Sequence, residues 1–243
     1  MRIPRVHVEQ ELAVGTAIVL AQAQSHYLKH VLRLKPGAAL LLFNGREARD
    51  YPSVLRADGK QLIAQIEGEQ AVDTESGIAC EIIQGLGRAD HMDWVIQKTT
   101  ELGAARILLF NAERSQRPPK PAQMQKKMQH WRGVAISAAE QSGRAIIPGI
   151  DFEQDLAAAI DTCTAETRLL LDFDGAAPAD ALPRATASVA ILLGPEGGLT
   201  PAEIELASSR GFTPLRLGPR VLRTETAATA ALAIVQSLAG DIG

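Results

Sequence analysis

The pattern of apolar residues changes near residue 78, and this change constrains the fold more than any other feature of the sequence. Beyond it, short apolar runs typical of buried strands alternate with longer segments typical of helices. The predicted strands are residues 78–84, 106–110, 168–173, 189–193 and 214–217. The predicted helices are residues 90–102, 122–141, 200–210 and 224–238. Such alternation predicts an α/β domain with a mostly parallel sheet.

The part of the chain before residue 73 has a different pattern. Short runs of apolar or alternating residues are separated by Pro-Gly, Asn-Gly and Asp-Gly pairs, which are typical of tight turns. The runs are residues 6–8, 17–20, 39–43 and 62–66, and one short helix is expected near residues 25–34. We therefore expect a small β-barrel over residues 1–72 and the α/β domain over residues 73–243, with the polar stretch 68–77 as the linker.

Composition excludes several classes of protein. Apolar residues make up 46% of the 243 positions, which is enough for a packed core. No stretch of about 18 uncharged apolar residues is present, so no membrane-spanning helix is expected. Neither is a secretory signal, because no apolar segment follows the charged N-terminus. The two cysteines, Cys80 and Cys163, argue against a disulfide framework and favour a reducing, cytoplasmic setting.

No metal site is expected either. His26 and His30 are spaced to share one face of a helix, but no carboxylate or cysteine lies near them in the sequence. Their neighbours Lys29 and Arg33 favour a basic helix face instead.

The net charge of −3 by itself argues against a nucleic-acid partner. The charge is unevenly distributed, however, because the window 106–132 contains seven basic side chains and one acidic side chain, Glu113. Runs of charge usually form solvated faces, but a cluster of one sign is costly unless it meets an anion. The window therefore favours a surface that contacts phosphates.

A glycine-rich loop follows the predicted strand 189–193. Gly194, Gly197 and Gly198 surround Pro195 and Glu196, and a helix with clear N-terminal signals begins after Thr200. An ordinary turn between a strand and a helix needs one glycine. Three glycines let the backbone approach a ligand closely and expose its N–H groups, so we interpret the loop as part of a ligand site.

A second loop, at residues 217–223, also joins a strand to a helix and contains a Gly-Pro pair. Ligands of α/β sheets bind at the edge where the strands end, so the two loops are expected to meet there. Favourable interaction with the helix dipole explains Glu225 near the helix start, but it does not explain Arg223, whose charge opposes the dipole. Arg223 is therefore a candidate functional residue.

Other ligand motifs are absent or incomplete in the sequence. Gly85-Leu86-Gly87 lies between a predicted strand and a predicted helix, but Asp90 occupies the position of the third glycine of a dinucleotide-binding loop. There is no phosphate-binding loop of the Walker type and no Gly-x-Ser-x-Gly motif, which disfavours a P-loop nucleotidase and an α/β-hydrolase.

Seven segments spread over the whole chain occur together in one known family. They are residues 1–5 (Met-Arg-Ile-Pro-Arg), 27–33 (Tyr-Leu-Lys-His-Val-Leu-Arg), 92–103 (Met-Asp-Trp-Val-Ile-Gln-Lys-Thr-Thr-Glu-Leu-Gly), 113–115 (Glu-Arg-Ser), 138–144 (Ala-Ala-Glu-Gln-Ser-Gly-Arg), 194–198 (Gly-Pro-Glu-Gly-Gly) and 217–227 (Leu-Gly-Pro-Arg-Val-Leu-Arg-Thr-Glu-Thr-Ala). With these segments in this order, the chain resembles the 16S ribosomal RNA uridine-N3 methyltransferases (RsmE) of the SPOUT superfamily.

The resemblance implies an architecture and partners that spacing alone does not show. The N-terminal barrel would be a PUA-like RNA-binding domain, and the C-terminal α/β domain would be a SPOUT domain with a trefoil knot. S-adenosylmethionine would be the methyl donor, and 16S rRNA, within the assembled 30S subunit, would be the substrate. The enzyme would be a cytoplasmic homodimer, and the apolar helix 224–238 would be buried in the core or at the subunit interface.

The resemblance also implies roles for individual residues. The cofactor would contact Leu171, Asp172, Leu193, Gly194, Pro195, Glu196, Gly197, Gly198, Leu217, Gly218, Arg220, Val221, Leu222 and Thr226. The RNA would contact Arg2, Arg5, Lys29, His30, Arg33 and Arg114.

Methylation of uridine at N3 requires loss of the N3 proton. Arg223 would stabilise the negative charge that develops on the base, and Glu196 or Glu225 would accept the proton. Two alternatives stay open at this point: a SPOUT methyltransferase that acts on another RNA site, and an RNA-binding assembly factor without catalytic activity.

Overall fold

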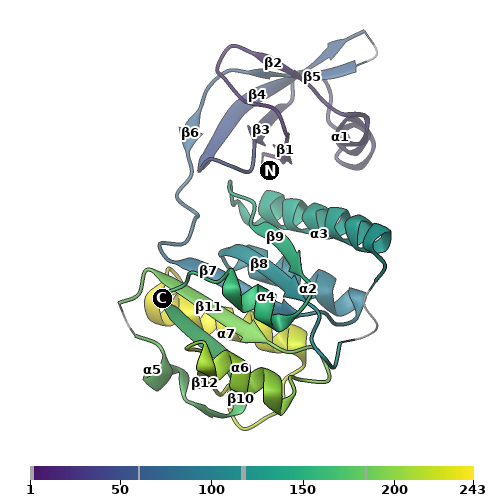
Figure 1. Ribbon diagram of the computed structural model, residues 1–243. Coiled ribbons are helices and arrows are strands. Elements are labelled where there is room, and N and C mark those ends of the chain that lie inside the picture. Colours follow the sequence, from purple (N-terminus) through teal and green to yellow (C-terminus); the bar gives the residue numbers. More distant parts are fainter. Residues whose placement is uncertain (1–2, 60, 116–118, 184) are drawn as a thin grey trace. The chain divides into compact units, whose positions relative to one another are not determined.

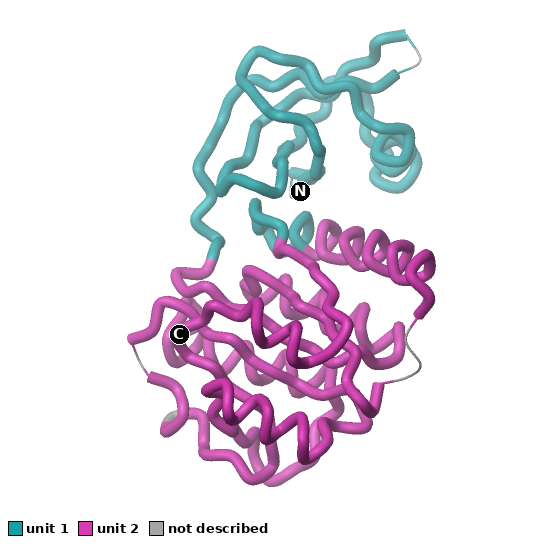
Figure 2. The backbone as a smooth tube through the Cα atoms, in the orientation of Figure 1, with its two compact units in different colours: residues 1–75, 139–147 teal, residues 76–138, 148–243 magenta. Residues whose placement is uncertain are grey.

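The computed structural model describes residues 3–59, 61–115, 119–183 and 185–243. The chain forms two compact units (Figure 2). The first unit contains residues 1–75 and 139–147, and the second contains residues 76–138 and 148–243. The short segment 139–147 therefore belongs to the first unit, although the α/β part of the chain precedes and follows it in the sequence. The expected division of the chain at residue 72 assigns this segment to the second domain.

A six-stranded sheet forms most of the first unit (Figure 1). Its strands are β1 (Arg5–His7), β2 (Ala17–Val19), β3 (Ala39–Phe43), β4 (Arg49–Asp58), β5 (Gln61–Ile66) and β6 (Gln70–Ala71). The order is β1-β3-β4-β5-β2, with β6 paired to β4; β1 lies parallel to β3, and the other described pairs are antiparallel. Leucines from β3, β4 and β5 fill an apolar core, together with Leu28.

Two features of this unit differ from the sequence-based expectation. Strand β4 was not expected, because Pro52 and four charged residues interrupt its apolar pattern. Pro52 lacks an N–H group, but its carbonyl accepts hydrogen bonds from the N–H groups of Glu67 and Gly68. The expected helix begins and ends about three residues earlier and is irregular, consisting of α1 (Gln22–His26) and a π-helical turn η1 (Tyr27–Val31).

Buried polar contacts explain why residues 139–147 belong to the first unit. Arg5 Nη1 donates hydrogen bonds of 2.8 Å to the carbonyl oxygens of Ala139 and Arg144. Arg144 in turn forms an ion pair with Glu75, at 2.7 Å. The backbone N–H of Ile147 donates to the carbonyl of Gly45. These contacts join residues that are far apart in the sequence, so local patterns did not reveal them.

The second unit is built on a parallel sheet, as the strand–helix alternation predicted. Its strands are β7 (Ala79–Gly85), β8 (Ala104–Phe110), β9 (Gly149–Glu153), β10 (Thr167–Ala176), β11 (Ser188–Leu193) and β12 (Thr213–Leu215). Their order is β12-β10-β11-β7-β8-β9, and all the described pairs are parallel. The helices are α2 (Ala89–Glu101), α3 (Pro121–Ser142), α4 (Leu156–Asp161), α5 (Pro178–Ala181), α6 (Pro201–Ser209) and α7 (Thr224–Ala239).

Helices cover both faces of this sheet (Figure 1). Helices α4 and α6 lie in front of it in this view, and α2 and α7 lie behind it. Helix α6 starts as predicted, because the side chains of Thr200 and Glu203 form a capping box. The elements β9, α4 and α5 were not expected. They are short, and β9 is an edge strand without buried residues, so their apolar patterns are weak.

Among the described residues, no helix is both long enough and apolar enough to span a membrane.

Candidate functional site

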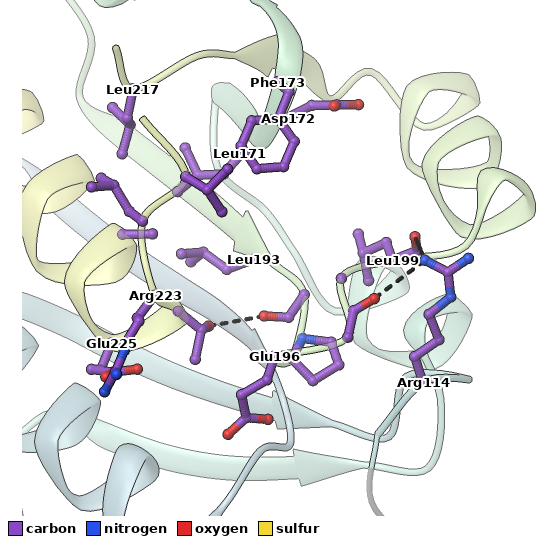
Figure 3. Close-up of a pocket in the computed structure, with 18 of the residues that line it drawn as sticks. Arg114, Leu171, Asp172, Phe173, Leu193, Glu196, Leu199, Leu217, Arg223 and Glu225 are labelled. Atoms are coloured by element: carbon purple, nitrogen blue, oxygen red, sulfur yellow. Dashed lines mark hydrogen bonds between the residues drawn. The ribbon is translucent and has the colours of Figure 1, made fainter. Parts of the chain in front are cut away.

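A pocket of about 680 Å³ lies in the second unit, where strand β10 and the loops after β11 and β12 meet the start of α7 (Figure 3). Because these strands are parallel and adjacent, the loops after them emerge at the same edge of the sheet. The pocket is lined by His91, Arg114, Leu171, Asp172, Phe173, Leu193, Gly194, Pro195, Glu196, Gly197, Gly198, Leu199, Ile204, Leu215, Leu217, Gly218, Arg220, Val221, Leu222, Arg223, Thr224, Glu225 and Ala227.

The pocket contains most of the residues predicted from the sequence. All the predicted cofactor residues line it except Thr226. Thr226 is exposed on α7 and does not line the pocket, so the structure does not support its predicted contact with the cofactor. The three candidate catalytic residues, Glu196, Arg223 and Glu225, also line it. Sequence reasoning missed His91 and Phe173. The apolar walls and the polar mouth suit an organic ligand with both apolar and charged parts.

The glycine-rich loop is packed so closely on itself that it has no room for a side chain at Gly194. A Cβ atom at Gly194 would lie 2.8 Å from the backbone of Gly198 and Leu199. Gly198 has a φ of 68°, a conformation that favours glycine, and its N–H donates to the carbonyl of Pro195 at 2.8 Å. The first and third glycines of the loop are therefore needed for its tight course.

Gln84 fixes this loop to the start of α7. Its Nε2 lies 3.0 Å from the carbonyl oxygen of Gly194 and 3.1 Å from Oγ1 of Thr224. Thr224 Oγ1 donates a further hydrogen bond of 3.0 Å to the carbonyl of Gly194. Gln84 is fully buried at the end of β7. Its polar side chain in a mostly apolar strand was the signal that could have identified it.

Arg114, a predicted RNA contact, is exposed and also contacts the glycine-rich loop. Its Nη1 donates hydrogen bonds of 3.2 Å and 3.1 Å to the carbonyl oxygens of Gly197 and Leu199 (Figure 3). Arg114 thus supports the glycine-rich loop from outside the sheet. This contact gives the residue a structural role in the pocket that the prediction of RNA binding did not include.

Glu196 accepts two hydrogen bonds, one from Arg88, the residue before α2, and one from His91 in the first turn of α2. Its Oε1 lies 2.9 Å from the backbone nitrogen of Arg88 and 2.8 Å from Nδ1 of His91. Partial burial acts to raise the pKa of Glu196, but the hydrogen bonds from Arg88, from its own backbone and from His91 outweigh it and lower the pKa. Glu196 is therefore a poor proton acceptor.

Glu225 is placed differently. Its Oε2 is buried and has no hydrogen-bond partner among the described residues. Nδ1 of His91 lies 3.6 Å from this oxygen. Arg223, the residue before the first turn of α7, is exposed and lines the same pocket. The pocket thus contains the carboxylate of Glu225, whose Oε2 can still accept a hydrogen bond, and Arg223, two residues before it in the chain.

The predicted RNA contacts in the first unit divide into two groups. Lys29, His30 and Arg33 are exposed on and just after η1, and Arg33 has a φ of 55°. Arg5 is buried instead: its guanidinium pairs with Asp50 at 2.6 Å and with the two carbonyls described above. These contacts use four of the five N–H donors of Arg5, and its side chain is only 5% exposed, so Arg5 is not placed to contact a phosphate and this expectation was wrong. Arg2 lies outside the described residues.

The described residues contain no group of three or more metal-ligating side chains that could hold a metal ion.

Two family models match the chain. An RNA methyltransferase domain matches residues 74–236, and an RNA methyltransferase PUA domain matches residues 20–49.

Proteins named ribosomal RNA small subunit methyltransferase E match over nearly the whole chain. That of Buchnera aphidicola (subsp. Schizaphis graminum) is 33% identical over 242 residues, covering 99% of this chain and 98% of the relative. That of Bacillus subtilis is 31% identical over 240 residues, covering 93% of this chain and 92% of the relative.

Solved structures agree with these matches. The ribosomal RNA small subunit methyltransferase E of Neisseria gonorrhoeae, bound to S-adenosylmethionine, has 31% identity and a TM-score of 0.91, with 100% of both chains covered. A methyltransferase of Legionella pneumophila, in complex with S-adenosylmethionine, has 34% identity and a TM-score of 0.93, covering 99% of this chain and 100% of that one. The α/β fold with an N-terminal PUA domain is thereby confirmed, and the chain belongs to the ribosomal RNA small subunit methyltransferase E family.

Proposed function

We propose that the protein transfers the methyl group of S-adenosylmethionine to N3 of a specific uridine in the 16S rRNA of the small subunit. The observation that carries the proposal is the pocket formed by strand β10 and the loops after β11 and β12. Membership of the family and the cofactor bound to its solved relatives support the same activity.

The residues of the pocket fit the cofactor. Gly194 lets the glycine-rich loop fold closely on itself, and backbone groups of this loop can bind polar edges of the ligand. Leu171, Leu193 and Leu222 supply apolar surface for an adenine ring. When bound, S-adenosylmethionine supplies an activated methyl group on a sulfonium.

Two side chains would act on the uridine, Glu225 and Arg223. N3 must lose its proton, and Glu225 is the better acceptor because its Oε2 is buried and unpartnered, whereas Glu196 already accepts two hydrogen bonds. Arg223 would stabilise the negative charge that develops on the oxygens of the base. Because N3 lies on the pairing edge, the uridine must be unpaired or flipped out.

The two parts of the chain would have different functions. Residues 1–72 would bind RNA as a PUA-like domain, with Lys29, His30 and Arg33 contacting phosphates. Residues 73–243 would bind the cofactor and carry out the transfer. The assembled 30S subunit would be the substrate. A chain with a net charge of −3 is not attracted to RNA in general, so its binding would depend on the shape of a folded target.

A homodimer is part of the proposal. Helix α7 buries Ala228, Ala231 and Leu232 in its own unit but leaves Leu238 37% exposed. Trp94 on α2, which packs against α7, is 51% exposed. These apolar side chains suit an interface with a second copy.

Two measurements test the proposed function. Calorimetry should show one S-adenosylmethionine site per chain, which an assembly factor without catalytic activity would lack. Mapping of 3-methyluridine in ribosomal RNA from a strain without this gene should show loss of one modification in 16S rRNA, restored by the gene. A modification that persists in the deletion strain, or a loss confined to another RNA, would contradict the proposal.

A further inference from the structure

The structure separates the basic side chains of the window 106–132, which the sequence indicates as a surface for phosphates. Arg106 forms ion pairs with two carboxylates, at 2.7 Å and 2.9 Å, and Arg114 contacts the glycine-rich loop. Lys126 and Lys127, in the second turn of α3, line a second cavity, which shares no described residue with the pocket of Figure 3. No ion pair joins either lysine to a carboxylate of the described residues, so both charges are available to a ligand.

This second cavity has a size and a lining that suit one nucleotide. Its volume is about 500 Å³, within the range of sites for small ligands. Leu86, Ala89 and Pro119 give it apolar walls, and Gln123 adds an exposed amide beside the two lysines. None of the described lining residues is acidic, so the charged groups that line the cavity are all positive. Such a lining attracts an anion that also has an apolar part.

The packing of α3 on α2 holds Lys127 in place. Nε1 of Trp131 donates a hydrogen bond of 3.1 Å to Oδ1 of Asp93 on α2, and Nε2 of His130 lies 2.9 Å from Oδ2 of the same residue. Trp131 is 1% exposed, and Nζ of Lys127 lies 5.4 Å from the centre of its ring, within the range of a cation–π contact. A lysine ordered in this way loses less conformational freedom when it binds a ligand.

The start of α2 lies between the second cavity and the pocket of Figure 3. Ala89 lines the second cavity, and His91, two residues later, lines the pocket. Gly87 also lines the second cavity, and a Cβ atom at Gly87 would lie 2.6 Å from Oε2 of Glu196, which lines the pocket. The backbone of residues 87–89 therefore separates the two sites. An RNA strand whose flipped-out uridine enters the pocket would bring a neighbouring nucleotide to the second cavity.

We propose that the second cavity binds the nucleotide next to the target uridine, with the phosphate of that nucleotide on Lys126 and Lys127. This inference rests on the proposed function. RNA carries one phosphate per nucleotide, and two lysines without carboxylate partners match that charge and release counterions when they bind it. The apolar walls pack against the sugar and the base, which are uncharged. The cavity thereby fixes the strand beside the uridine and supplies binding energy outside the reacting centre.

Three variants separate the charge of the cavity from other effects. Lys126→Ala/Lys127→Ala removes both charges, and Lys126→Arg/Lys127→Arg keeps them. Lys120→Ala is the matched control, because Lys120 is an exposed lysine close by in the same segment that does not line the second cavity. None of these lysines lines the pocket of Figure 3, so all variants should bind S-adenosylmethionine with the affinity of the wild type.

The first test measures the Kd of the full-length protein for small ribosomal subunits that lack the modification, at several salt concentrations. Loss of both lysines should raise this Kd about tenfold or more. The slope of log affinity against log salt should become shallower by about one to two units. The value of kcat at saturating subunit should change by less than about twofold, as expected when binding outside the reacting centre is removed. The double arginine variant and Lys120→Ala should keep the Kd and the slope of the wild type.

An unchanged Kd in Lys126→Ala/Lys127→Ala would overturn the inference. An equal loss of affinity in Lys120→Ala would also overturn it, because general attraction of the surface to RNA, rather than the cavity, would then be responsible. Equal melting temperatures of the variants check that all are folded.

A second test locates the bound nucleotide. Gln123 lines the cavity and is exposed, so it can be replaced by the photoreactive residue benzoylphenylalanine in the full-length protein. Irradiation of the complex with the small subunit should crosslink this position to a nucleotide of 16S rRNA next to the methylated uridine. A crosslink to a ribosomal protein, or to RNA far from that uridine, would overturn the inference. If the wild-type protein binds the subunit but transfers no methyl group, the proposed function fails, whereas the Kd values and the crosslink still decide whether the cavity binds RNA.

Discussion

Gln84 and Thr224 are 140 residues apart in the sequence, and Nε2 of Gln84 lies 3.1 Å from Oγ1 of Thr224. Both side chains also reach the carbonyl of Gly194, at 3.0 Å each. This contact connects the end of β7, the glycine-rich loop and the first residue of α7. Two walls of the pocket are thereby held at a fixed distance from each other.

Thr224→Val should loosen this connection without changing the shape of the side chain. Valine removes the hydroxyl, so the buried amide of Gln84 loses one partner, which costs about 1–3 kcal/mol of unfolding free energy. The affinity for S-adenosylmethionine should fall as well. Chemical denaturation and calorimetry measure both effects. Unchanged cofactor affinity in this variant would show that the contact does not hold the pocket.

Gly194→Ala should disrupt the glycine-rich loop. The new Cβ would lie 2.8 Å from backbone atoms of Gly198 and Leu199, and backbone atoms cannot move aside cheaply. We expect a loss of about 1–3 kcal/mol of unfolding free energy and at least tenfold weaker cofactor binding. Gly133→Ala is the control, because Gly133 lies inside helix α3 with open space around it. That variant should be more stable by up to about 1 kcal/mol, with cofactor affinity unchanged.

Arg223→Ala should separate catalysis from cofactor binding. If Arg223 stabilises charge that develops on the uridine, its loss should lower kcat by about 100-fold or more. The Kd for S-adenosylmethionine should change little, since the loops that form the pocket keep their contacts. Single-turnover kinetics with the small subunit and calorimetry with the cofactor give the two values. Turnover equal to that of the wild type would contradict the assigned role.

Arg5→Ala should mainly destabilise the protein. Arg5 forms a buried ion pair with Asp50, and removal of one partner of such a pair costs about 3–5 kcal/mol because the other charge stays buried. Thermal unfolding measures this loss.

Lys29→Ala provides the contrast, because Lys29 is exposed on η1. Its unfolding free energy should stay within about 0.5 kcal/mol of the wild type. Its RNA affinity should be lower, and the slope of log affinity against log salt should become about one unit shallower. An unchanged salt slope would mean that Lys29 does not contact a phosphate.

Glu196 should make a contribution to stability that depends on pH. The pKa of Glu196 is lowered from its ordinary value of 4.5, so its ionised form favours the folded state. The difference in unfolding free energy between wild type and Glu196→Gln should be fully present above pH 4.5. It should shrink as the pH falls through the lowered pKa. Urea denaturation between about pH 3 and pH 7 measures it; a difference that grows on acidification would contradict the assignment.

The sequence predicted the elements with strong apolar periodicity. Helix α6 has both a capping box and a proline at its start, so its position could be predicted closely. Strand β4 was missed because Pro52 and its charged neighbours hide its pattern. The trefoil knot and the homodimer stay predictions, since both came from the resemblance to the family.

Residue patterns along the chain were enough to predict a parallel sheet and two ligand-binding loops at one edge of it. Those features depend on backbone periodicity and on glycine, which act over a few residues. Tertiary structure alone decided that Arg5 is buried, that Arg114 supports a loop and that His91 contacts two carboxylates. Each of these roles depends on a partner that only the folded path of the chain brings within a few ångströms, because burial and charge pairing are properties of the neighbourhood rather than of the residue.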